Sequence, residues 1–308
     1  MRLVFLGSGA FGLPTLERLA PAHEIALVVS QPDRPAGRRR RATPTPVAER
    51  AQRRGFATIK PRDVNEPATV RAILGAGADA VVVIAYGQKL GPGLLAGPPA
   101  VNLHGSLLPK CRGAAPIQWT MINGEKEAGV TAIEVAPRMD AGAILGQRVT
   151  PIDPRETAGE LHDRLAALGP EVMLEVLEKM AAGTLAPREQ DETLATRAPR
   201  LTKADGTVDF AQPAEAVRCR VHGLTPWPGC TVVLNGARLL LRRVEIAPGG
   251  EPGSAPRAPG SIGPDGAIAC APGAVRLETV QAAGGKPMSF AAYRRGHDVP
   301  AGSRLAPL

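Results

Sequence analysis

A short, uninterrupted apolar run limits the fold class of this chain most strongly. Residues Ala80–Ala85 are all apolar, which is typical of a strand covered on both faces. Strand and helix patterns alternate on both sides of this run. The predicted strands are Arg2–Leu6, Glu24–Ser30, Ala57–Ile59, Ala100–Leu103 and Val130–Val135, and the predicted helices are Phe11–Leu19, Pro46–Arg54, Val70–Leu74 and Pro116–Asn123. This alternation predicts an α/β fold with a doubly wound, mostly parallel sheet.

The helix predicted after this region begins with a recognisable cap. Thr157 and Glu160 have the spacing of a capping box, in which each side chain binds the other residue's backbone N–H. Gly169-Pro170 predicts a break in the helix, because proline removes an intrahelical hydrogen bond. A second helix is then predicted to end at Gly183.

The character of the sequence changes after residue 185. Residues 1–185 form the predicted catalytic domain, and residues 186–204 are polar and are predicted to be a linker. Residues 205–308 show short strand patterns with Gly/Pro turns and one helix, Ala214–Val221, which predicts a small, OB-like β-barrel. The predicted strands there are Val208–Phe210, Thr231–Leu234, Ala237–Ile246, Ala267–Ala269 and Ala274–Val280.

The positive charge of the chain is concentrated in one segment. The whole chain carries a formal net charge of +8. Residues 31–62 hold ten Arg and Lys side chains against two acids, so this segment accounts for the entire excess. A concentrated basic segment predicts a polyanionic partner such as a nucleic acid. A solvated arginine run is the alternative interpretation.

Cysteine use indicates a reducing compartment. The four cysteines, Cys111, Cys219, Cys230 and Cys270, lie far apart and match no metal-ligand spacing. We therefore expect free thiols in the cytoplasm and no metal. The chain begins directly with a strand pattern, so no signal or transit peptide is expected. No apolar run reaches the ~20 residues of a membrane-spanning helix, so no membrane partner is expected.

A polar pair lies at the end of the predicted strand Ala100–Leu103. Asn102 and His104 are two residues apart, so on a strand their side chains face the same way. Gly105 then lets the backbone turn. Open α/β sheets place their chemistry at the carboxyl edge of such strands. The alternative is a buried histidine whose ring is satisfied by a neighbouring carbonyl group.

A glycine pattern near the N-terminus resembles a dinucleotide-binding fingerprint. Gly7-Ser-Gly-Ala-Phe-Gly12 follows a predicted strand and opens a helix. The second strand, however, ends in Ser30 and lacks the acid that would bind a ribose, although Arg34 could serve an NADP phosphate. We favour glycines used for close packing and expect no NAD(P).

A carboxylate follows the next predicted strand. Val130–Val135 leads into a loop with Asp140 and Gly142, and we expect Asp140 at the same sheet edge as Asn102 and His104. A lone Asp-x-Gly otherwise caps a turn. An amide, an imidazole and a carboxylate together suit acyl transfer by direct amine attack, and no Ser or Cys nucleophile stands out.

Several segments together resemble the formyltransferase family that uses 10-formyltetrahydrofolate. The resemblance covers essentially the whole chain. The segments that carry it are Gln31–Arg38, Asn102–Pro109, Arg112–Gln118, Met139–Gly142, Leu201–Gly206 and Gly223–Pro228. The resemblance implies a Rossmann-like formyltransferase domain followed by an OB-like domain that binds tRNA. It also implies formyl transfer to the free α-amine of methionine on initiator tRNA.

The resemblance further implies a role for each site residue. Asn102 and His104 would stabilise the oxyanion of a tetrahedral intermediate, and Asp140 would help move protons. The folate donor would contact the backbone near Gln88 and Leu90. The wall of its pocket would be formed by four further residues: Ser106, Leu107, Leu108 and Pro109. The tRNA-binding candidates are Arg34, Arg38, Arg39, Arg40, Arg41, Arg218 and Arg220.

Three alternatives remain open at this point. A formyl-folate enzyme that acts on a small amine would share Asn102, His104 and Asp140 without needing the basic segment. A nucleic-acid-binding module would use the basic segment but leave those three residues unexplained. An NAD(P) oxidoreductase would use the glycine pattern. With no apolar seam evident in the sequence, we expect a monomer.

Overall fold

The chain folds into two units, each assembled from several of its segments. The computed structural model describes residues 1–36, 41–248 and 257–307. Unit 1 consists of Met1–Pro116, Ala128–Thr150 and His162–Ala198, and unit 2 consists of Ile117–Glu127, Pro151–Leu161 and Pro199–Leu308. The segment 186–204, expected to be a linker, is therefore divided, because its residues as far as Ala198 belong to unit 1.

A seven-stranded sheet with the order β10-β9-β7-β6-β1-β2-β5 forms the centre of unit 1. Its strands are β1 (Arg2–Gly7), β2 (Glu24–Val29), β5 (Thr58–Ile59), β6 (Ala80–Ile84), β7 (Ala100–His104), β9 (Glu127–Glu134) and β10 (Ile144–Pro151). The pairs from β5 to β7 are parallel, whereas β9 runs antiparallel to β7. All five residues of β6 are buried, which confirms the interpretation of the apolar run.

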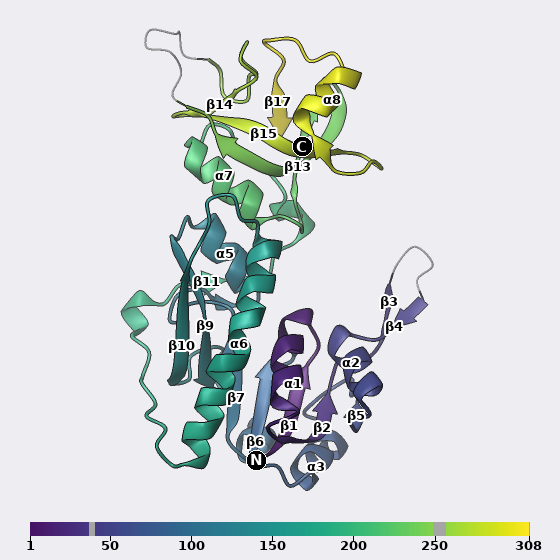
Figure 1. Cartoon of the computed structure of the whole chain (residues 1–308), viewed down its shortest axis with the longest axis vertical. Coiled ribbons are helices and arrows are strands. Elements are labelled where there is room, and N and C mark those ends of the chain that lie inside the picture. The colour runs from purple at the N-terminus through teal and green to yellow at the C-terminus, as the bar shows by residue number, and fades with distance from the viewer. Residues whose placement is uncertain (37–40, 249–256, 308) are drawn as a thin grey trace. The chain divides into compact units, whose positions relative to one another are not determined.

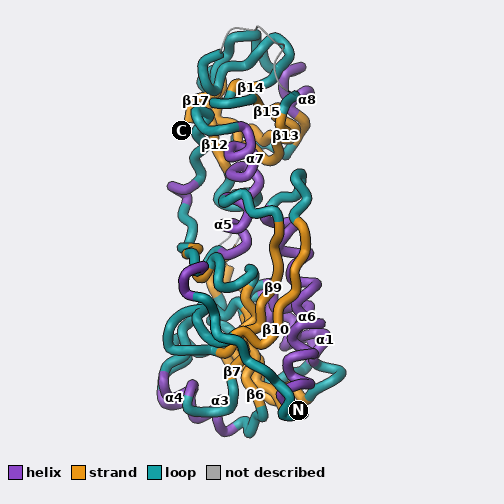
Figure 2. Tube along the Cα trace, turned by 90° about the vertical axis from the view of Figure 1, so that its left-hand side faces the viewer, coloured by secondary structure: helices purple, strands orange, loops and turns teal. Residues whose placement is uncertain are grey.

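Helices cover both faces of this sheet. In Figure 1, α1 and α6 lie in front of the strands, and Figure 2 shows α3 and α4 on the opposite side of the sheet. The helices are α1 (Leu13–Leu19), α2 (Pro46–Arg54), α3 (Pro67–Gly75), α4 (Pro92–Leu95) and α6 (Ala158–Ala181), with short 3₁₀ turns η1 (Ala10–Gly12) and η2 (Glu192–Leu194). The prediction of a doubly wound, mostly parallel α/β fold is confirmed.

The glycine pattern of the first turn serves packing in this structure. A Cβ atom on Gly7 would lie 2.6 Å from Cε1 of Phe5, and one on Gly12 would lie 3.3 Å from Cβ of Ile84. The turn therefore sits directly against the strands β1 and β6, as the close-packing interpretation requires.

The predicted break of α6 at Gly169-Pro170 is wrong. The helix runs without interruption from Ala158 to Ala181 and contains Pro170 in its interior. An interior proline costs about 3 kcal/mol. Buried apolar side chains before and after it hold the helix against the sheet, and this packing outweighs the local cost. They include Leu161, Leu165, Val172, Met173, Val176 and Leu177. The capping box at Thr157 and Glu160 is present as predicted.

Two short strand pairs lie outside the main sheet, and the sequence patterns did not indicate them. Strands β3 (Arg34–Ala36) and β4 (Arg41–Thr43) form an antiparallel hairpin. Strands β8 (Arg112–Gly113) and β11 (Arg197–Ala198) pair in parallel. The second pair holds the last residues of unit 1, which end at Ala198, against the segment that follows β7.

Unit 2 is built on a curled antiparallel sheet with the order β14-β15-β13-β12-β17, and β16 pairs with β15. A register shift between Leu241 and Val244 of β13 adds twist, which helps the sheet to curl. The strands are β12 (Cys230–Leu234), β13 (Ala237–Ile246), β14 (Ile268–Ala269), β15 (Ala274–Ala282), β16 (Met288–Ser289) and β17 (Leu305–Pro307). The helices of this unit are α5 (Pro116–Ile122), α7 (Ala214–Gly223) and α8 (Phe290–Gly296), with the 3₁₀ turn η3 (Lys203–Asp205).

The sequence predicted the type of this unit better than its details. Strands β12 and β13 lie where they were expected, and the alternating burial of β12 marks one face as core. The predicted strand Val208–Phe210 is wrong, because these residues form no strand. Val208 and Phe210 are nevertheless buried, so their apolar character reflects packing of an irregular segment.

His222 of α7 couples the stability of unit 2 to pH. Its side chain is almost fully buried, and its Nε2 accepts a hydrogen bond of 3.1 Å from the backbone N–H of Val244. Burial, followed by the positive charges of Arg218 and Arg243, lowers the pKa of His222 to about 4. A buried neutral histidine stabilises the fold above the unfolded-state pKa near 6.5, and this contribution is lost as pH falls toward 4.

We therefore expect the free energy of unfolding to fall less steeply at acid pH in His222→Gln than in the native protein. Between pH 7.5 and 4.5 this one group should remove about 2 to 3 kcal/mol from the free energy of unfolding of the native protein. Urea unfolding at the two pH values measures this loss, and the variant should lose less by that amount. His297→Gln, which changes an exposed histidine of the same unit, is the control. Parallel profiles for the native protein and His222→Gln would contradict the assignment.

The four cysteines are buried and unpaired, as expected. Among the helices in the described ranges, none combines the length and the apolar character needed to cross a membrane.

Candidate active site

The end of strand β7 carries the first two site residues. Asn102 lies beside Val83 of β6 and Ile133 of β9 in the sheet. Because Asn102 and His104 are two residues apart on one strand, their side chains leave the same face. Asn102 is half-buried, and its amide makes no hydrogen bond with the described part of the chain. This amide is therefore free to donate to a bound substrate.

His104 is buried and has two different ring environments. Its Nε2 lies 2.9 Å from the backbone oxygen of Cys111, and its Nδ1 lies 3.7 Å from Oδ2 of Asp140. A carbonyl oxygen only accepts, so Nε2 must carry the hydrogen and donate it. The alternative, a buried histidine that is hydrogen-bonded to a carbonyl group, thus holds for Nε2. The other nitrogen, Nδ1, faces the carboxylate of Asp140 and remains available.

Asp140 is held by its backbone and by its side chain. Its φ angle of 53° is in the left-handed region, which Asp tolerates better than most residues. Its Oδ2 accepts a hydrogen bond of 2.9 Å from the backbone N–H of Gly113. The side chain is only 13% exposed, so its contact with His104 is largely shielded from bulk water.

The route that brings Asp140 to His104 differs from the expected one. A residue just after β9 would lie at the edge of His104 directly only if the two strands were parallel. Strand β9 is instead antiparallel to β7, and its last residue Glu134 pairs with Val101 near the start of β7. Residues 135–143, here called the carboxylate loop, must therefore run back to reach His104. Gly142 makes this path possible, since a Cβ there would lie 2.0 Å from the backbone oxygen of Glu134.

The turn after His104 is fixed by the neighbouring strands. Thr131 Oγ1 of β9 donates to the backbone oxygen of Ser106 at 2.6 Å and accepts from the N–H of Leu108 at 3.2 Å. Gln147 of β10 donates to the backbone oxygen of Leu108 at 3.1 Å. Of the four predicted wall residues, Ser106 and Leu108 are buried, whereas Leu107 and Pro109 are half-buried.

The side chains of Gln88 and Leu90 bind and pack against other residues of unit 1. Gln88 Oε1 accepts from the N–H of Val64 at 2.8 Å, and its Nε2 donates to the backbone oxygen of Arg62 at 3.1 Å. Leu90 is buried in a core cluster with Val64. Any contact of these two residues with a donor must therefore come from their backbone, which is what the resemblance implied.

The predicted tRNA-binding arginines fall into two groups. Arg34 and Arg41 are exposed on the β3–β4 hairpin, where Arg34 donates to Gln31 Oε1 at 2.8 Å. Arg38, Arg39 and Arg40 lie outside the described residues.

The other two arginines, on α7, are engaged with partners inside unit 2. Arg218 donates twice to Glu215, at 2.6 and 3.2 Å. Arg220 donates to the backbone oxygens of Asp205 and Thr207. Their role in binding tRNA stays a prediction.

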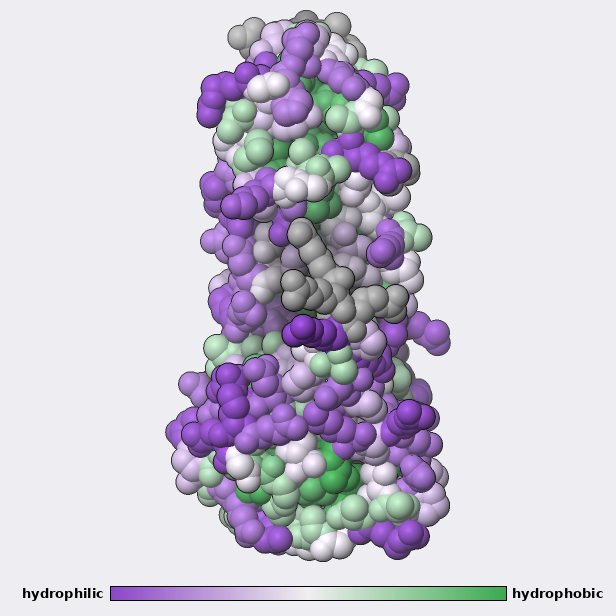
Figure 3. Space-filling model, turned by 90° about the vertical axis from the view of Figure 1, so that its right-hand side faces the viewer, coloured by the Kyte–Doolittle hydropathy of each residue, from purple (hydrophilic) through white to green (hydrophobic). Residues whose placement is uncertain are grey.

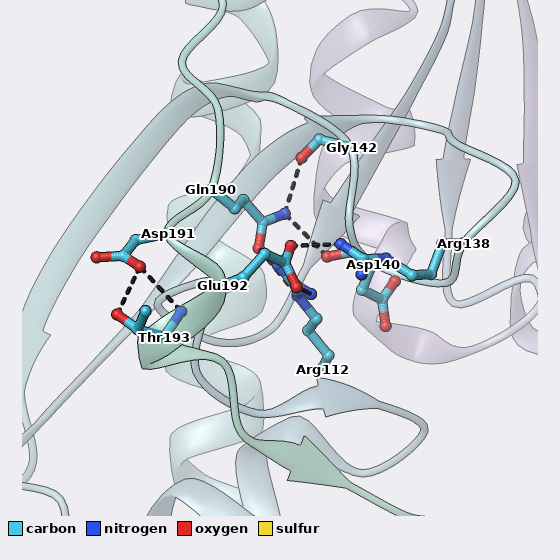
Figure 4. A network of polar contacts seen from close by, with 8 residues as sticks. All are labelled: Arg112, Arg138, Asp140, Gly142, Gln190, Asp191, Glu192 and Thr193. Atoms are coloured by element: carbon cyan, nitrogen blue, oxygen red, sulfur yellow. Dashed lines mark hydrogen bonds and ion pairs between the residues drawn. The ribbon is translucent and has the colours of Figure 1, made fainter.

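A polar network surrounds the carboxylate loop, and its residues match no motif in the sequence. Figure 4 shows Gln190 and Glu192, which precede β11, together with Arg112 and Arg138 next to the backbone of Asp140. These residues lie in or contact the segment that was expected to be a linker. No motif in that segment indicated contacts with residues about 50 to 80 positions away in the chain.

Within the described ranges, no group of three or more His, Cys, Asp and Glu side chains could hold a metal ion.

Comparison with known proteins identifies relatives along the whole chain. The family model "Formyl transferase" matches residues 1–177, and the model "Formyl transferase, C-terminal domain" matches residues 200–298. The chain is 40% identical to a methionyl-tRNA formyltransferase from Geotalea uraniireducens, over 99% of this chain and 98% of the relative. It is 43% identical to a methionyl-tRNA formyltransferase from Heliobacterium modesticaldum, over 99% of this chain and 100% of the relative.

Solved structures show the same fold at lower sequence identity. HypX from Aquifex aeolicus, crystallised in complex with tetrahydrofolic acid, matches 96% of this chain with a TM-score of 0.60 and 20% identity. This chain spans 47% of the length of that protein. The N-formyltransferase from Helicobacter canadensis, in complex with folinic acid and dTDP-3-aminofucose, matches 80% of this chain and 87% of its own, with a TM-score of 0.62 and 15% identity.

Proposed function

Because this chain belongs to the formyl transferase family, we infer that it transfers a formyl group from 10-formyltetrahydrofolate to the free α-amine of methionine on initiator tRNA. The observation that carries this function is the near-complete match, at 40% and 43% identity, to two relatives named methionyl-tRNA formyltransferase. The transfer is a step that prepares translation initiation. The free amide of Asn102 and the pair of His104 and Asp140 supply the donors and the proton acceptor that this chemistry needs.

The reaction balances without any further reagent. The amine nitrogen forms a bond to the formyl carbon, and the bond between that carbon and N10 of the folate breaks. The amine loses one proton and N10 gains one. Direct attack of the amine gives a tetrahedral intermediate with a negatively charged oxygen, and no covalent intermediate with the enzyme is needed.

The site residues divide these tasks among them. Asn102 donates its amide N–H to the developing oxyanion, in a half-buried position where such a bond is stronger than in water. The resemblance implied that His104 would also stabilise the oxyanion, but its Nε2 already donates to the Cys111 carbonyl. We therefore give His104 a different role, in which Nδ1 takes the proton from the amine. The Asp140 carboxylate, 3.7 Å from Nδ1, balances the positive charge that the ring then carries.

The donor site is proposed to lie along the rigid turn 105–109. The turn is held by Thr131 and Gln147, so it can present its backbone and the half-buried side chains of Leu107 and Pro109 in one geometry. The backbone near Gln88 and Leu90 is proposed to contact the folate ring system. Preorganised walls of this kind lower the entropic cost of binding.

The basic segment 31–62 is proposed to contact the acceptor end of the tRNA. Its charge supports this proposal, as does the exposure of Arg34 and Arg41 on the hairpin. Unit 2 is proposed to bind the tRNA backbone without reading its sequence, in the manner of OB-like domains.

Replacement of Arg38–Arg41 by alanine should weaken binding of initiator tRNA and leave the KM for the folate donor unchanged. If each arginine contacts one phosphate, the slope of log K against log salt should become shallower by about 3 to 4. Filter binding at several salt concentrations measures this slope. Arg71→Ala, which removes an exposed arginine from α3, is the control and should leave the slope unchanged. An unaltered slope in the fourfold variant would assign the tRNA contact to another part of the chain.

The most relevant alternative is formyl transfer to a small amine, since the N-formyltransferase from Helicobacter canadensis was crystallised with an amino sugar nucleotide. Labelled 10-formyltetrahydrofolate offered with methionyl-tRNA, and separately with small amines, tests the acceptor class. Label in the tRNA fraction supports the proposed function. Label in a small amine alone would favour the alternative.

We also propose that the protein acts as a cytoplasmic monomer. The four buried, unpaired thiols fit a reducing compartment. Hydrophilic side chains dominate much of the face drawn in Figure 3, with hydrophobic ones gathered in smaller areas. The large exposed apolar residues come from scattered elements: Leu74, Met139, Val149, Leu194, Trp227, Ile246 and Met288. A dimer in sedimentation velocity at micromolar concentration would contradict this proposal.

A further inference from the structure

Gln190 makes four hydrogen bonds from a buried position beside the carboxylate loop. Its Nε2 donates to the backbone oxygens of Asp140, at 2.9 Å, and of Gly142, at 2.7 Å. Its Oε1 accepts from Nε and Nη2 of Arg112, at 3.0 and 2.8 Å. Figure 4 shows the amide between the loop and the guanidinium group. The side chain is 8% exposed.

The orientation of this amide follows from its partners. Two carbonyl oxygens can only accept, and a guanidinium group can only donate. The opposite orientation of the amide would place oxygen against oxygen and N–H against N–H, so the amide of Gln190 can satisfy both sides in one way only. Among common side chains, this combination requires a primary amide.

The segment that presents Gln190, residues 187–198, is itself fastened to the site and is here called the strap. Ile144 and Arg188 exchange two backbone hydrogen bonds, of 2.8 and 2.9 Å. Thr196 Oγ1 accepts from the N–H of Cys111 at 2.8 Å, and Arg112 N–H donates to the backbone oxygen of Thr196 at 2.9 Å. The strap thus touches the segment after β7 and the end of the carboxylate loop.

Both ends of the His104–Asp140 contact therefore depend on the strap. Cys111, whose carbonyl accepts from His104, is fixed by Thr196. Asp140, whose carboxylate faces His104, is fixed by Gln190 through its own carbonyl and that of Gly142. The left-handed backbone at Asp140 is a conformation that surrounding contacts must maintain.

We propose that Gln190 is a positioning residue for the formyl transfer, because its two N–H groups hold the carboxylate loop so that Asp140 faces His104. The proposal rests on the function inferred above. Gln190 touches neither reacting group and acts through Asp140. Arg112, anchored on its far side by Glu192 at 2.9 and 3.0 Å, keeps the Gln190 amide turned toward the loop.

Two substitutions separate positioning from mere packing. Gln190→Glu keeps the length and the contact with Arg112, but it replaces the two donors with an oxygen that faces two carbonyl oxygens. Gln190→Met keeps the approximate size and removes all four hydrogen bonds. Glu189→Gln changes the neighbouring, exposed residue of the strap and is the matched control.

The proposal predicts that kcat falls roughly 100-fold in Gln190→Glu, since small misplacements of catalytic groups cost that much. The KM values for donor and tRNA should stay within about threefold of the native values, because ground-state contacts are untouched. Gln190→Met should lose no more kcat than Gln190→Glu, although it loses more hydrogen bonds. A packing role predicts the reverse order, in which the glutamate variant is close to native. A kcat of Gln190→Glu within threefold of native would overturn the proposal.

A double-mutant cycle keeps the proposal testable if one variant is poorly folded. Once Asp140→Asn has removed the carboxylate, Gln190→Met should lower kcat by less than about threefold, because residues that act through one another are not additive. Independent, multiplicative losses would overturn the proposal. The native enzyme is assayed first, because a lack of transfer there would contradict the proposed function and not this inference.

Discussion

His104→Ala should lower kcat for formyl transfer by roughly 10²- to 10⁴-fold, the range expected when a general base is removed. The side chain is 6% exposed and its contacts are all within the site. The affinity for tRNA should therefore stay within about twofold of the native value, since phosphate contacts dominate that affinity. Rapid-quench measurement of formyl transfer, with filter binding of tRNA in parallel, gives both numbers.

The control for this prediction is another histidine of unit 1. His162 is about one third exposed and interacts with Asp163 on α6, far along the chain from the site. His162→Gln should leave kcat near the native value. A kcat of His104→Ala within tenfold of native would remove the imidazole from the mechanism and leave Asp140 as the proton acceptor.

Asn102→Ala should lower kcat by roughly 100- to 1000-fold, the usual cost of losing one oxyanion donor. Because the negative charge develops only after the amine attacks, the KM for both substrates should change little. Asn102→Asp should be at least as impaired, because a carboxylate near the oxyanion repels it instead of donating to it. Steady-state kinetics at saturating donor measures the ratio.

Asn123→Ala is the matched control for Asn102, because Asn123 is exposed at the end of α5. A variant series in which KM rises and kcat is unchanged would indicate that Asn102 binds the ground state of a substrate. In that case the oxyanion donor would have to be sought elsewhere.

Much of unit 1 could be predicted from local sequence patterns. The continuous apolar run at Ala80–Ala85 indicates a strand covered on both faces, because its short length and its β-branched residues favour a strand over a buried helix. Asn102 and His104 could be placed on one face because strand periodicity fixes their relative direction. The helix at Pro46–Arg54 matches its predicted bounds, since Thr45, Pro46 and Gly55 supply clear end signals.

The parts that failed depend on non-local contacts. A strand pattern does not reveal whether its neighbour is parallel, so the antiparallel pairing of β9 and the return of the carboxylate loop were not foreseen. By local rules Pro170 predicts a break in the helix, but the packing of α6 on the sheet outweighs the local cost of the proline. Gln190 lies in a polar stretch without periodicity, and only its partners Arg112 and Asp140 reveal its importance.

The organisation of unit 2 was also hidden from a linear reading of the chain. Residues 117–127 and 151–161 belong to it, and Glu160 pairs with Arg243 at 2.6 Å, whereas Arg155 pairs with Glu278 at 2.8 Å. An isolated fragment 205–308 would lack these partners. Experiments on tRNA binding should therefore use the full chain.

The first measurement to make is the transfer of labelled formyl groups from 10-formyltetrahydrofolate to methionyl-initiator tRNA, with methionyl-elongator tRNA as the parallel acceptor. Purified full-length protein, the His104→Ala variant and a reaction without enzyme complete the set. We expect the native protein to formylate the initiator tRNA rapidly and the elongator tRNA only slightly, and we expect almost no formylation by the variant. Absence of transfer to initiator tRNA by folded, folate-binding native protein would contradict the proposed function.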